Sequence, residues 1–306
     1  STFNVLVTHD PYARIGKHGI EGSYWHNGRN IPFEEGQKDP TLRGDDAAIV
    51  MNKAIPFIRE QAKAKKPFLA VVWFHNVHTP LGKNSELMKQ YADCSVKEQI
   101  YYSNITAVDT QVGALRKALR ELGIADNTMV WFTSDNGPNT KNRSTNETTN
   151  QESGGLRGKK AKIWEGGIRV PFLAQWKGTI PAGQIYKKPV SSFDIYATAA
   201  ANSEGVIAPE LVEGVDLVPF VTDKKKGVPH ETLFWRQGGK SGLRHGDWKI
   251  VRMGGRKSPG KSKWELYDLS KDLSEETNLA QSKPERLTEL VELWEKMNSE
   301  MAEPLF

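Results

Sequence analysis

Residues 126–138 read Asp-Asn-Thr-Met-Val-Trp-Phe-Thr-Ser-Asp-Asn-Gly-Pro, an apolar run that ends in polar turn residues. The apolar part, residues 128–133, predicts a strand that is covered on both faces, as in parallel sheets. Residues 67–74 have the same character, and residues 168–176 form a third candidate strand. Residues 97–122, which lie between the first two strands, carry apolar side chains at helical spacing. This order of elements predicts an α/β fold with a mostly parallel central sheet.

The C-terminal part of the chain has a different pattern. Short strand candidates are separated by Gly, Lys and Ser turns, and a helix follows that we expect to open with a capping box from Ser282 to Glu285. This pattern predicts a small antiparallel sheet with a terminal helix. We therefore expect an α/β core over residues 1–224 and a C-terminal antiparallel subdomain over residues 225–306. The strand candidates are residues 232–236, 247–252 and 263–268.

Near the start of the chain, residues 45–65 predict a helix with one apolar face. Pro56 lies inside this helix and is expected to kink it, because proline removes one backbone hydrogen bond.

The composition excludes several classes of protein. Hydrophobic residues make up 38% of the chain, and nine Trp, eight Tyr and eleven Phe argue against a disordered protein. No apolar run approaches the roughly 20 residues that a membrane-spanning helix needs, so we expect no membrane span. A nucleic-acid-binding protein would carry a basic stripe interleaved with exposed aromatic residues, and we expect no nucleic-acid partner. The single cysteine, Cys94, excludes an internal disulfide.

Asp135 and Asn136 directly follow the strand predicted at residues 128–133. Ligands of open α/β sheets gather outside the carboxyl ends of the strands. Carboxylate and amide oxygens are ligands suited to Ca²⁺ or Mg²⁺. The sequence Asp-Asn-Gly-Pro also makes a good turn, so a metal site and a simple turn both remain open.

Two histidines, His75 and His78, follow the strand predicted at residues 67–74. Such residues bind transition metals or transfer protons. In an extended loop only one of them is expected to point into a cleft. The alternative is a structural histidine held by hydrogen bonds.

A third segment, residues 158–169, places lysines between glycines. An ammonium group in such a loop is a point charge suited to a sulfate or phosphate. The alternative is a solvated basic loop in which Glu165 and Arg169 pair with each other. A polar tract, Asn139–Ser153, precedes it and is expected to be a surface loop or a flap beside an active site.

Taken in this order, the segments resemble the sulfatase family of the alkaline-phosphatase superfamily. The resemblance implies an alkaline-phosphatase-like fold and a hydrolase of sulfate esters of carbohydrate or aryl substrates, located in the periplasm or outside the cell. It rests on FLAVVWFHNVHTPL (68–81), LGIADNTMVWFTSDNGP (122–138), GGLRGKKAKIWEGGIRVPFLAQWKG (154–178), LRHGDWKIV (243–251) and WELYDLSKDLSEETNLA (264–280).

The resemblance also implies roles for four residues. Asp135 and Asn136 match the second pair of ligands to one Ca²⁺ ion, which would act as a Lewis acid on a sulfate oxygen. His78 matches the histidine that contacts the sulfate and helps to protonate the leaving oxygen. Lys160 matches the lysine that holds the sulfate and offsets its charge, although the adjacent Lys159 leaves a shift of one residue open.

The nucleophile that the resemblance implies is a formylglycine, made from Cys or Ser in a Cys/Ser-x-Pro-x-Arg motif. Cys94 does not fit, because Ser-Val-Lys-Glu follows it. Asp45-Asp46 is expected to start a helix and not to supply the early pair of calcium ligands. We therefore expect the motif and that ligand pair to lie upstream of Ser1, and not within this chain. The chain alone is then expected to have negligible activity.

Two other functions remain open. One is a phosphodiesterase or phosphonate hydrolase of the same superfamily. The other is a non-catalytic protein that binds anions or glycans and has lost its nucleophile. The oligomeric state and the particular sulfated substrate are not predicted.

Overall fold

The structure is a computed structural model, and its described residues fall into two compact units, Ser1–Thr128 and Met129–Phe306. Each unit has its own hydrophobic core. The predicted boundary between residues 224 and 225 lies inside the second unit. Described are residues 24–26, 29–78, 81–138, 153–203, 212–254 and 262–302.

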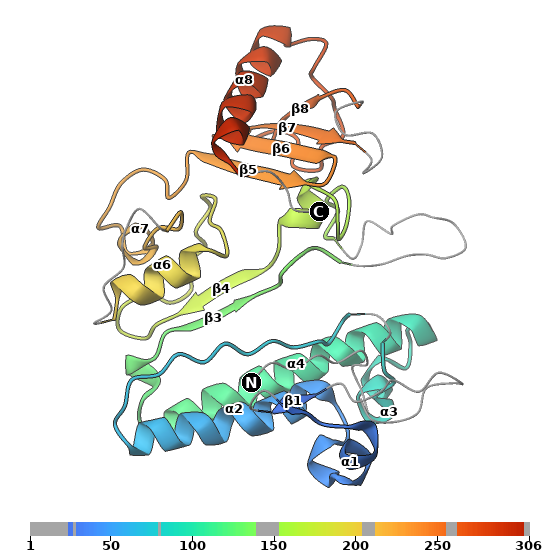
Figure 1. Ribbon diagram of the computed structural model, residues 1–306, viewed down its shortest axis with the longest axis vertical. Coiled ribbons are helices and arrows are strands. Elements are labelled where there is room, and N and C mark those ends of the chain that lie inside the picture. The colour runs from blue at the N-terminus through green and yellow to red at the C-terminus, as the bar shows by residue number, and fades with distance from the viewer. Residues whose placement is uncertain are drawn as a thin grey trace. The chain divides into compact units, whose positions relative to one another are not determined.

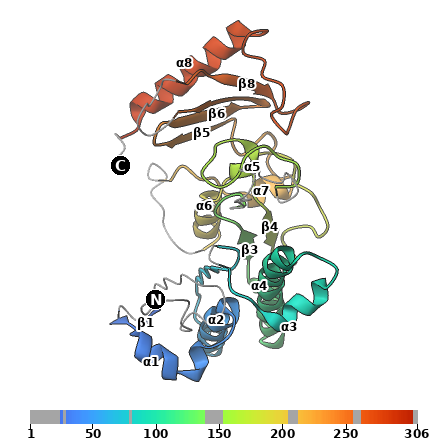
Figure 2. The same ribbon diagram turned by 90° about the vertical axis from the view of Figure 1, so that its right-hand side faces the viewer.

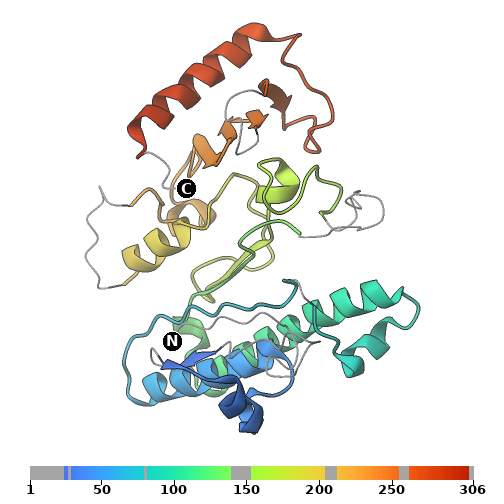
Figure 3. The same cartoon turned by 45° about the vertical axis from the view of Figure 1, so that its right-hand side comes forward.

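Two long helices form the frame of the first unit. α2 (Asp46–Lys63) and α4 (Val96–Glu121) run side by side and pack against each other (Figures 1 and 3). They are the helices predicted over residues 45–65 and 97–122, and Pro56 lies inside α2. The smaller elements are β1 (Trp25–His26), β2 (Arg29–Asn30), α1 (Phe33–Lys38), η1 (Pro40–Leu42), α3 (Ser85–Met88), η2 (Lys89–Tyr91) and η3 (Ala125–Asn127).

Residues 67–74 were predicted as a buried strand, and this prediction is wrong for the described part of the chain. They form neither a helix nor a paired strand there. Leu69, Val71 and Trp73 are 69%, 65% and 71% exposed. The apolar run indicates a preference for burial. A strand also needs a neighbour that accepts its backbone hydrogen bonds, and none of the described residues pairs with this segment.

The second unit begins with a two-stranded sheet. β3 (Val130–Thr133) pairs with β4 (Phe172–Gln175), so that Val130 lies opposite Gln175. Both strands were predicted, but they run antiparallel, as do all strand pairs among the described residues. Parallel neighbours need a long crossover connection, usually a helix. Between β3 and β4 the described residues contain only the four-residue helix α5 (Glu165–Ile168). The parallel pairing is therefore not seen among these strands.

A four-stranded antiparallel sheet with a terminal helix closes the second unit, as predicted. The strands are β5 (Thr232–Gln237), β6 (Lys240–His245), β7 (Trp248–Met253) and β8 (Glu265–Asp268), in that order across the sheet. α8 (Pro284–Glu300) covers one face of the sheet (Figure 2). Its Leu290 and Trp294 pack on Leu243, Ile250 and Leu266. The unit also contains α6 (Asp194–Ala201) and α7 (Val218–Val221).

The capping box predicted at Ser282 is wrong. α8 starts at Pro284, and the preceding Lys283 makes no side-chain cap. Proline fits the first helical position because that residue needs no amide donor. The Ser282 hydroxyl therefore lies one residue too early to cap the helix, and it donates to the Leu279 carbonyl at 3.2 Å.

Two further expectations concern the polar tract and the absence of a membrane-spanning helix. The polar tract Asn139–Ser153 lies, apart from Ser153, outside the described residues. Among the helices that the structure describes, none combines the length and the apolar character that crossing a membrane requires.

Candidate anion and metal site

Two of the segments singled out in the sequence meet in the second unit. We call residues 135–138 the Asp-Asn turn and residues 156–169 the lysine loop. The Gly137 amide donates to the Gly167 carbonyl at 2.9 Å, and the Lys160 amide donates to the Pro138 carbonyl at 3.0 Å. The segment with the predicted metal-ligand pair therefore lies beside the segment with the predicted anion-binding lysine, an arrangement that the order of the sequence did not require.

Glycines allow this close approach of the two segments. A Cβ atom on Gly137 would lie 1.9 Å from the Gly166 carbonyl oxygen. One on Gly167 would lie 2.1 Å from the Lys162 carbonyl oxygen. Only glycine leaves room for backbones this close. Gly137 therefore allows the contact between the two segments, and Gly167 allows the lysine loop to fold closely on itself.

The lysine loop concentrates positive charge next to the Asp-Asn turn. The Lys160 side chain is half-buried, and no hydrogen bond or ion pair among the described residues engages its ammonium group. The Lys162 ammonium lies 5.9 Å from the centre of the Trp164 ring. Lys240 donates to the Ala161 carbonyl at 2.7 Å. Burial lowers the pKa of Lys240, and the charge of Lys162 lowers it further.

The Asp-Asn turn presents oxygen atoms that suit a hard cation. Asp135 is exposed, and within the described residues no hydrogen bond or ion pair holds its carboxylate. A simple turn would use this carboxylate as a cap for the Gly137 amide, which donates to Gly167 instead. Asp135 and Asn136 together supply only part of the six to eight oxygens that Ca²⁺ takes. Elsewhere among the described residues, no group of three or more His, Cys, Asp or Glu could hold a metal ion.

The two histidines, which belong to the first unit, have different surroundings. The His75 amide donates to an Asp46 carboxylate oxygen at 3.1 Å, and its ring nitrogen Nδ1 lies 3.4 Å from the same oxygen. The backbone of His75 is therefore tied to Asp46, at the start of the helix α2. His78 is exposed, and its amide donates to the His75 carbonyl at 2.9 Å. Asp45 caps α2 through the Ala47 amide, as expected for a helix start.

A residue with a strained backbone lies next to each of the two predicted catalytic residues, His78 and Lys160. Among the described residues, five that are not glycine have positive φ. Val77 (φ 70°) directly precedes His78, and Ala161 (φ 67°) directly follows Lys160. A β-branched residue in this conformation is a genuine outlier. Such strain costs about 1–3 kcal/mol and is concentrated at functional sites.

A buried lysine that the sequence reasoning missed anchors the lysine loop. Lys249 lies in β7 and is fully buried, with Nζ 2.7 Å from Glu165 Oε1 and 2.9 Å from Glu275 Oε1. The second oxygen of Glu275 accepts the Glu165 amide at 2.5 Å. The expected pair of Glu165 and Arg169 is also present, at 3.4 Å. The signal in the sequence was a lysine at an inward-facing position of a strand, between Trp248 and Ile250.

The pKa values of Glu165 and Glu275, the two carboxylates beside Lys249, are shifted in opposite directions. Burial alone would raise the pKa of Glu165, but the Lys249 charge and hydrogen bond outweigh it, so this pKa lies below its usual value. Burial raises the pKa of Glu275, which the Lys249 charge only partly offsets. Lys249 thus faces two buried carboxylates, and Arg169 and Arg244 further lower the pKa of Glu165.

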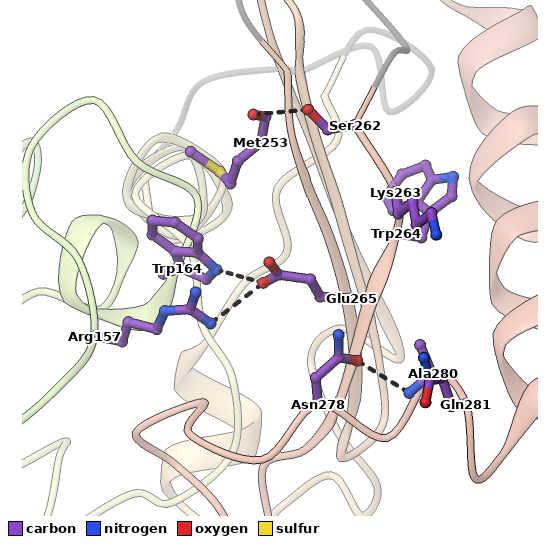
Figure 4. Close-up of a pocket in the computed structure, with 10 residues that line it drawn as sticks. All are labelled: Arg157, Trp164, Met253, Ser262, Lys263, Trp264, Glu265, Asn278, Ala280 and Gln281. Atoms are coloured by element: carbon purple, nitrogen blue, oxygen red, sulfur yellow. Dashed lines mark hydrogen bonds and ion pairs between the residues drawn. The ribbon is translucent and has the colours of Figure 1, made fainter.

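The start of the lysine loop is fastened to β8 at a crevice of about 370 Å³ (Figure 4). Arg157 Nη1 donates to the Glu265 carboxylate at 3.2 Å and to the Glu275 carbonyl at 3.1 Å. Its guanidinium group lies 4.0 Å from the centre of the Trp164 ring. The Trp164 indole in turn donates to Glu265 at 3.1 Å. Arg157, Trp164 and Glu265 bond to one another in this crevice, and these bonds join the loop to the sheet.

One occurrence of the Ser-x-Pro-x-Arg spacing escaped the sequence reasoning. It lies at Ser282–Arg286, so the expectation that this spacing lies only upstream of the chain is wrong. The structure gives these residues a helix-start role. Pro284 is the first residue of α8, and Arg286 donates to the Glu289 carboxylate at 2.7 Å.

Comparisons with known proteins identify the family of this chain. Residues 10–203 match the family model described as Sulfatase, and residues 158–303 match the one described as N-sulphoglucosamine sulphohydrolase, C-terminal. Steryl-sulfatase of Homo sapiens is 36% identical over 177 residues, which cover 57% of this chain and 29% of that protein. The match thus spans less than a third of that relative's length.

Solved structures show the same fold. Ps i-CgsB, in complex with k-i-k-neocarrahexaose, has a TM-score of 0.73 and 26% identity, covering 89% of this chain and 57% of that chain. The PsFucS1 sulfatase from Pseudoalteromonas sp. has a TM-score of 0.65 and 23% identity, with 83% of this chain and 52% of that chain covered. The predicted alkaline-phosphatase-like fold is thereby confirmed. Because the Sulfatase model matches more than half of its residues, the chain belongs to the sulfatase family.

Proposed function

We propose that the protein containing this chain hydrolyses sulfate esters of carbohydrate or aryl compounds. The observation that carries the proposal is the pair of backbone hydrogen bonds that joins the Asp-Asn turn to the lysine loop. A sulfate ester presents charged oxygens, which need both a cation and positioned donors. Two similar proteins support this substrate range: one is named Arylsulfatase H, and Ps i-CgsB was solved in complex with k-i-k-neocarrahexaose.

Lys160 is proposed to hold the sulfate group. Its ammonium group, which no described residue engages, sits in a cationic loop, where it would offset the charge on the ester and on its transition state. Lys162 is less suited, because its ammonium group lies over the Trp164 ring.

Asp135 and Asn136 are proposed to supply two of the ligands of a single Ca²⁺ ion. Their oxygens are the type that calcium takes, and the Asp135 carboxylate has no competing partner among the described residues. When bound, the ion would polarise a sulfate oxygen.

His78 is proposed to contact the sulfate and to donate a proton to the leaving oxygen. Its exposure and the strained Val77 beside it support this role. The proposal also requires a nucleophile, which the family resemblance implies to be a formylglycine and which none of the residues named here supplies. We further propose a periplasmic or extracellular location.

The test compares 4-nitrophenyl sulfate with 4-nitrophenyl phosphate as substrates of the full-length protein. Faster release of nitrophenol from the sulfate, abolished by chelation of calcium, is the expected result. Preference for the phosphate would assign the protein to phosphoester chemistry. Binding of sulfate without turnover would make it an anion-binding protein.

The 306-residue chain alone serves as the control. We expect negligible turnover from it, because Asp135 and Asn136 are only part of a calcium ligand set and no nucleophile is assigned in it. Robust turnover by the chain alone would contradict the assigned chemistry.

A further inference from the structure

The lysine loop is held at two points on either side of Lys160. Before Lys160, Arg157 donates to the Glu275 carbonyl at 3.1 Å. After it, the Glu165 amide donates to the Glu275 carboxylate at 2.5 Å, and the Glu165 carboxylate pairs with Lys249 at 2.7 Å. Glu275 thus contacts the loop on both sides of the lysine, once through its backbone and once through its side chain.

Burial of three charged groups needs an explanation beyond stability. Glu165, Lys249 and Glu275 are 3%, 0% and 0% exposed. Taking ions out of water is costly, and a buried ion pair is often no more stabilising than apolar side chains of the same volume. Buried ionic groups do fix geometry, since each charge has few alternative partners. The location of this triad under the lysine loop indicates what it fixes.

The conformation of Glu275 supports the same view. Its φ is 56°, in the left-handed region that side chains other than glycine rarely adopt. Strain of this kind persists only where the surrounding contacts determine the conformation. Here those contacts are Lys249, the Glu165 amide and Arg157.

We infer that Glu275 and Lys249 are positioning residues for Lys160, so that the C-terminal sheet sets the place of the sulfate-holding ammonium group. This inference rests on the function proposed for Lys160. Neither residue touches substrate. They act through Glu165 and the lysine loop.

The test replaces Glu275 by glutamine in the full-length protein. Glu275→Gln keeps the shape of the side chain and an acceptor for the Glu165 amide, but it removes the charge opposite Lys249. Glu276→Gln is the matched control, because Glu276 is the exposed neighbour. We expect Glu275→Gln to lower kcat/KM for a nitrophenyl sulfate by about 10–100-fold, the usual effect of losing a supporting contact, and Glu276→Gln to leave it unchanged.

A double-mutant cycle separates positioning from a general structural role. If Glu275 acts through Lys160, then Glu275→Gln should change kcat/KM by no more than roughly twofold in a Lys160→Ala background, the ordinary limit of additivity error. The same large factor in both backgrounds would overturn the inference.

Amide hydrogen exchange supplies a readout that does not depend on activity. In Glu275→Gln we expect faster exchange across residues 156–169 and unchanged exchange in β6 and β7. Unchanged exchange in the loop would overturn the inference even if the protein hydrolyses no sulfate ester, which would contradict only the proposed function. Lys249→Met is the second variant. Loss of the folded unit in both variants would assign the triad a purely structural role and would also overturn the inference.

Discussion

Lys160 differs from its neighbours in what its side chain contacts. No described residue engages its ammonium group, whereas Lys162 lies over Trp164. In the full-length protein, Lys160→Ala should lower kcat by about 10²–10³, the usual cost of removing one positioned electrostatic donor. Lys159→Ala and Lys162→Ala should cost much less. Equal and small effects of all three changes on the hydrolysis of a nitrophenyl sulfate would indicate that these lysines form a solvated basic loop and that none of them holds the sulfate.

Ala161 carries strain that glycine would relieve. Its φ of 67° costs an L-residue about 1–2 kcal/mol, and its exposed methyl group makes little packing contact. Relief of this strain is partly offset, by about 0.5–1 kcal/mol, because glycine loses more conformational entropy on folding than alanine does. Ala161→Gly should therefore raise the free energy of unfolding by about 0.5–1 kcal/mol, as measured by urea denaturation. Ala161→Val should lower it, and a stabilising valine would contradict the strain.

At the scale of elements, the contact between the Asp-Asn turn and the lysine loop depends on a missing side chain. Gly137→Ala would place a methyl group 1.9 Å from the Gly166 carbonyl oxygen, so the two segments must separate. We expect a loss of several degrees in Tm and weaker sulfate binding. Gly113→Ala is the control, because it lies inside α4 with open space around it. It should stabilise that helix by about 0.5–1 kcal/mol. Equal effects of the two changes would contradict the close packing.

The elements that sequence predicted best are those whose signal is local. The periodicity of α2 and α4 and the turns between β5, β7 and β8 lie within short stretches, and all were found. β6 was missed, because Lys-Ser-Gly-Leu-Arg-His lacks the usual strand formers. Its Gly242 packs under Ile163 of the lysine loop, a reason that no local window contains. The direction of β4 and the partner of residues 67–74 are likewise long-range properties.

The candidate site was predictable to a similar degree. Family resemblance picked out Asp135, Asn136, His78 and Lys160, and residue chemistry gave each a reason. The triad around Lys249 joins residues 84 and 110 positions apart, and neither spacing nor composition points to it. The contact of His75 with Asp46 also required the structure, because 29 positions separate the two residues in the sequence.

At the scale of the whole molecule, residues 67–74 will influence how the chain behaves in solution. Leu69, Val71 and Trp73 alternate along the segment, and all three are exposed. An exposed apolar segment of this kind promotes aggregation. Trp73→Lys should therefore raise the concentration at which the chain stays monodisperse, as measured by light scattering. Ile185→Lys is the control, since Ile185 is 83% exposed in a different part of the chain. If both changes raised this concentration equally, the added charge alone would explain the effect.

Because Lys249 is buried, chemical labelling of its amine can be used to measure unfolding of the C-terminal sheet. An acylating reagent that attacks amines reaches Lys271, whose side chain is 82% exposed, but not an amine sealed between two carboxylates beneath a loop. In mass spectra of the labelled chain, Lys249 should stay unmodified until the C-terminal sheet opens. Its labelling rate would then follow the opening of that sheet alone, without an added dye or probe. Labelling of Lys249 as fast as Lys271 in the native chain would show that the sheet opens readily.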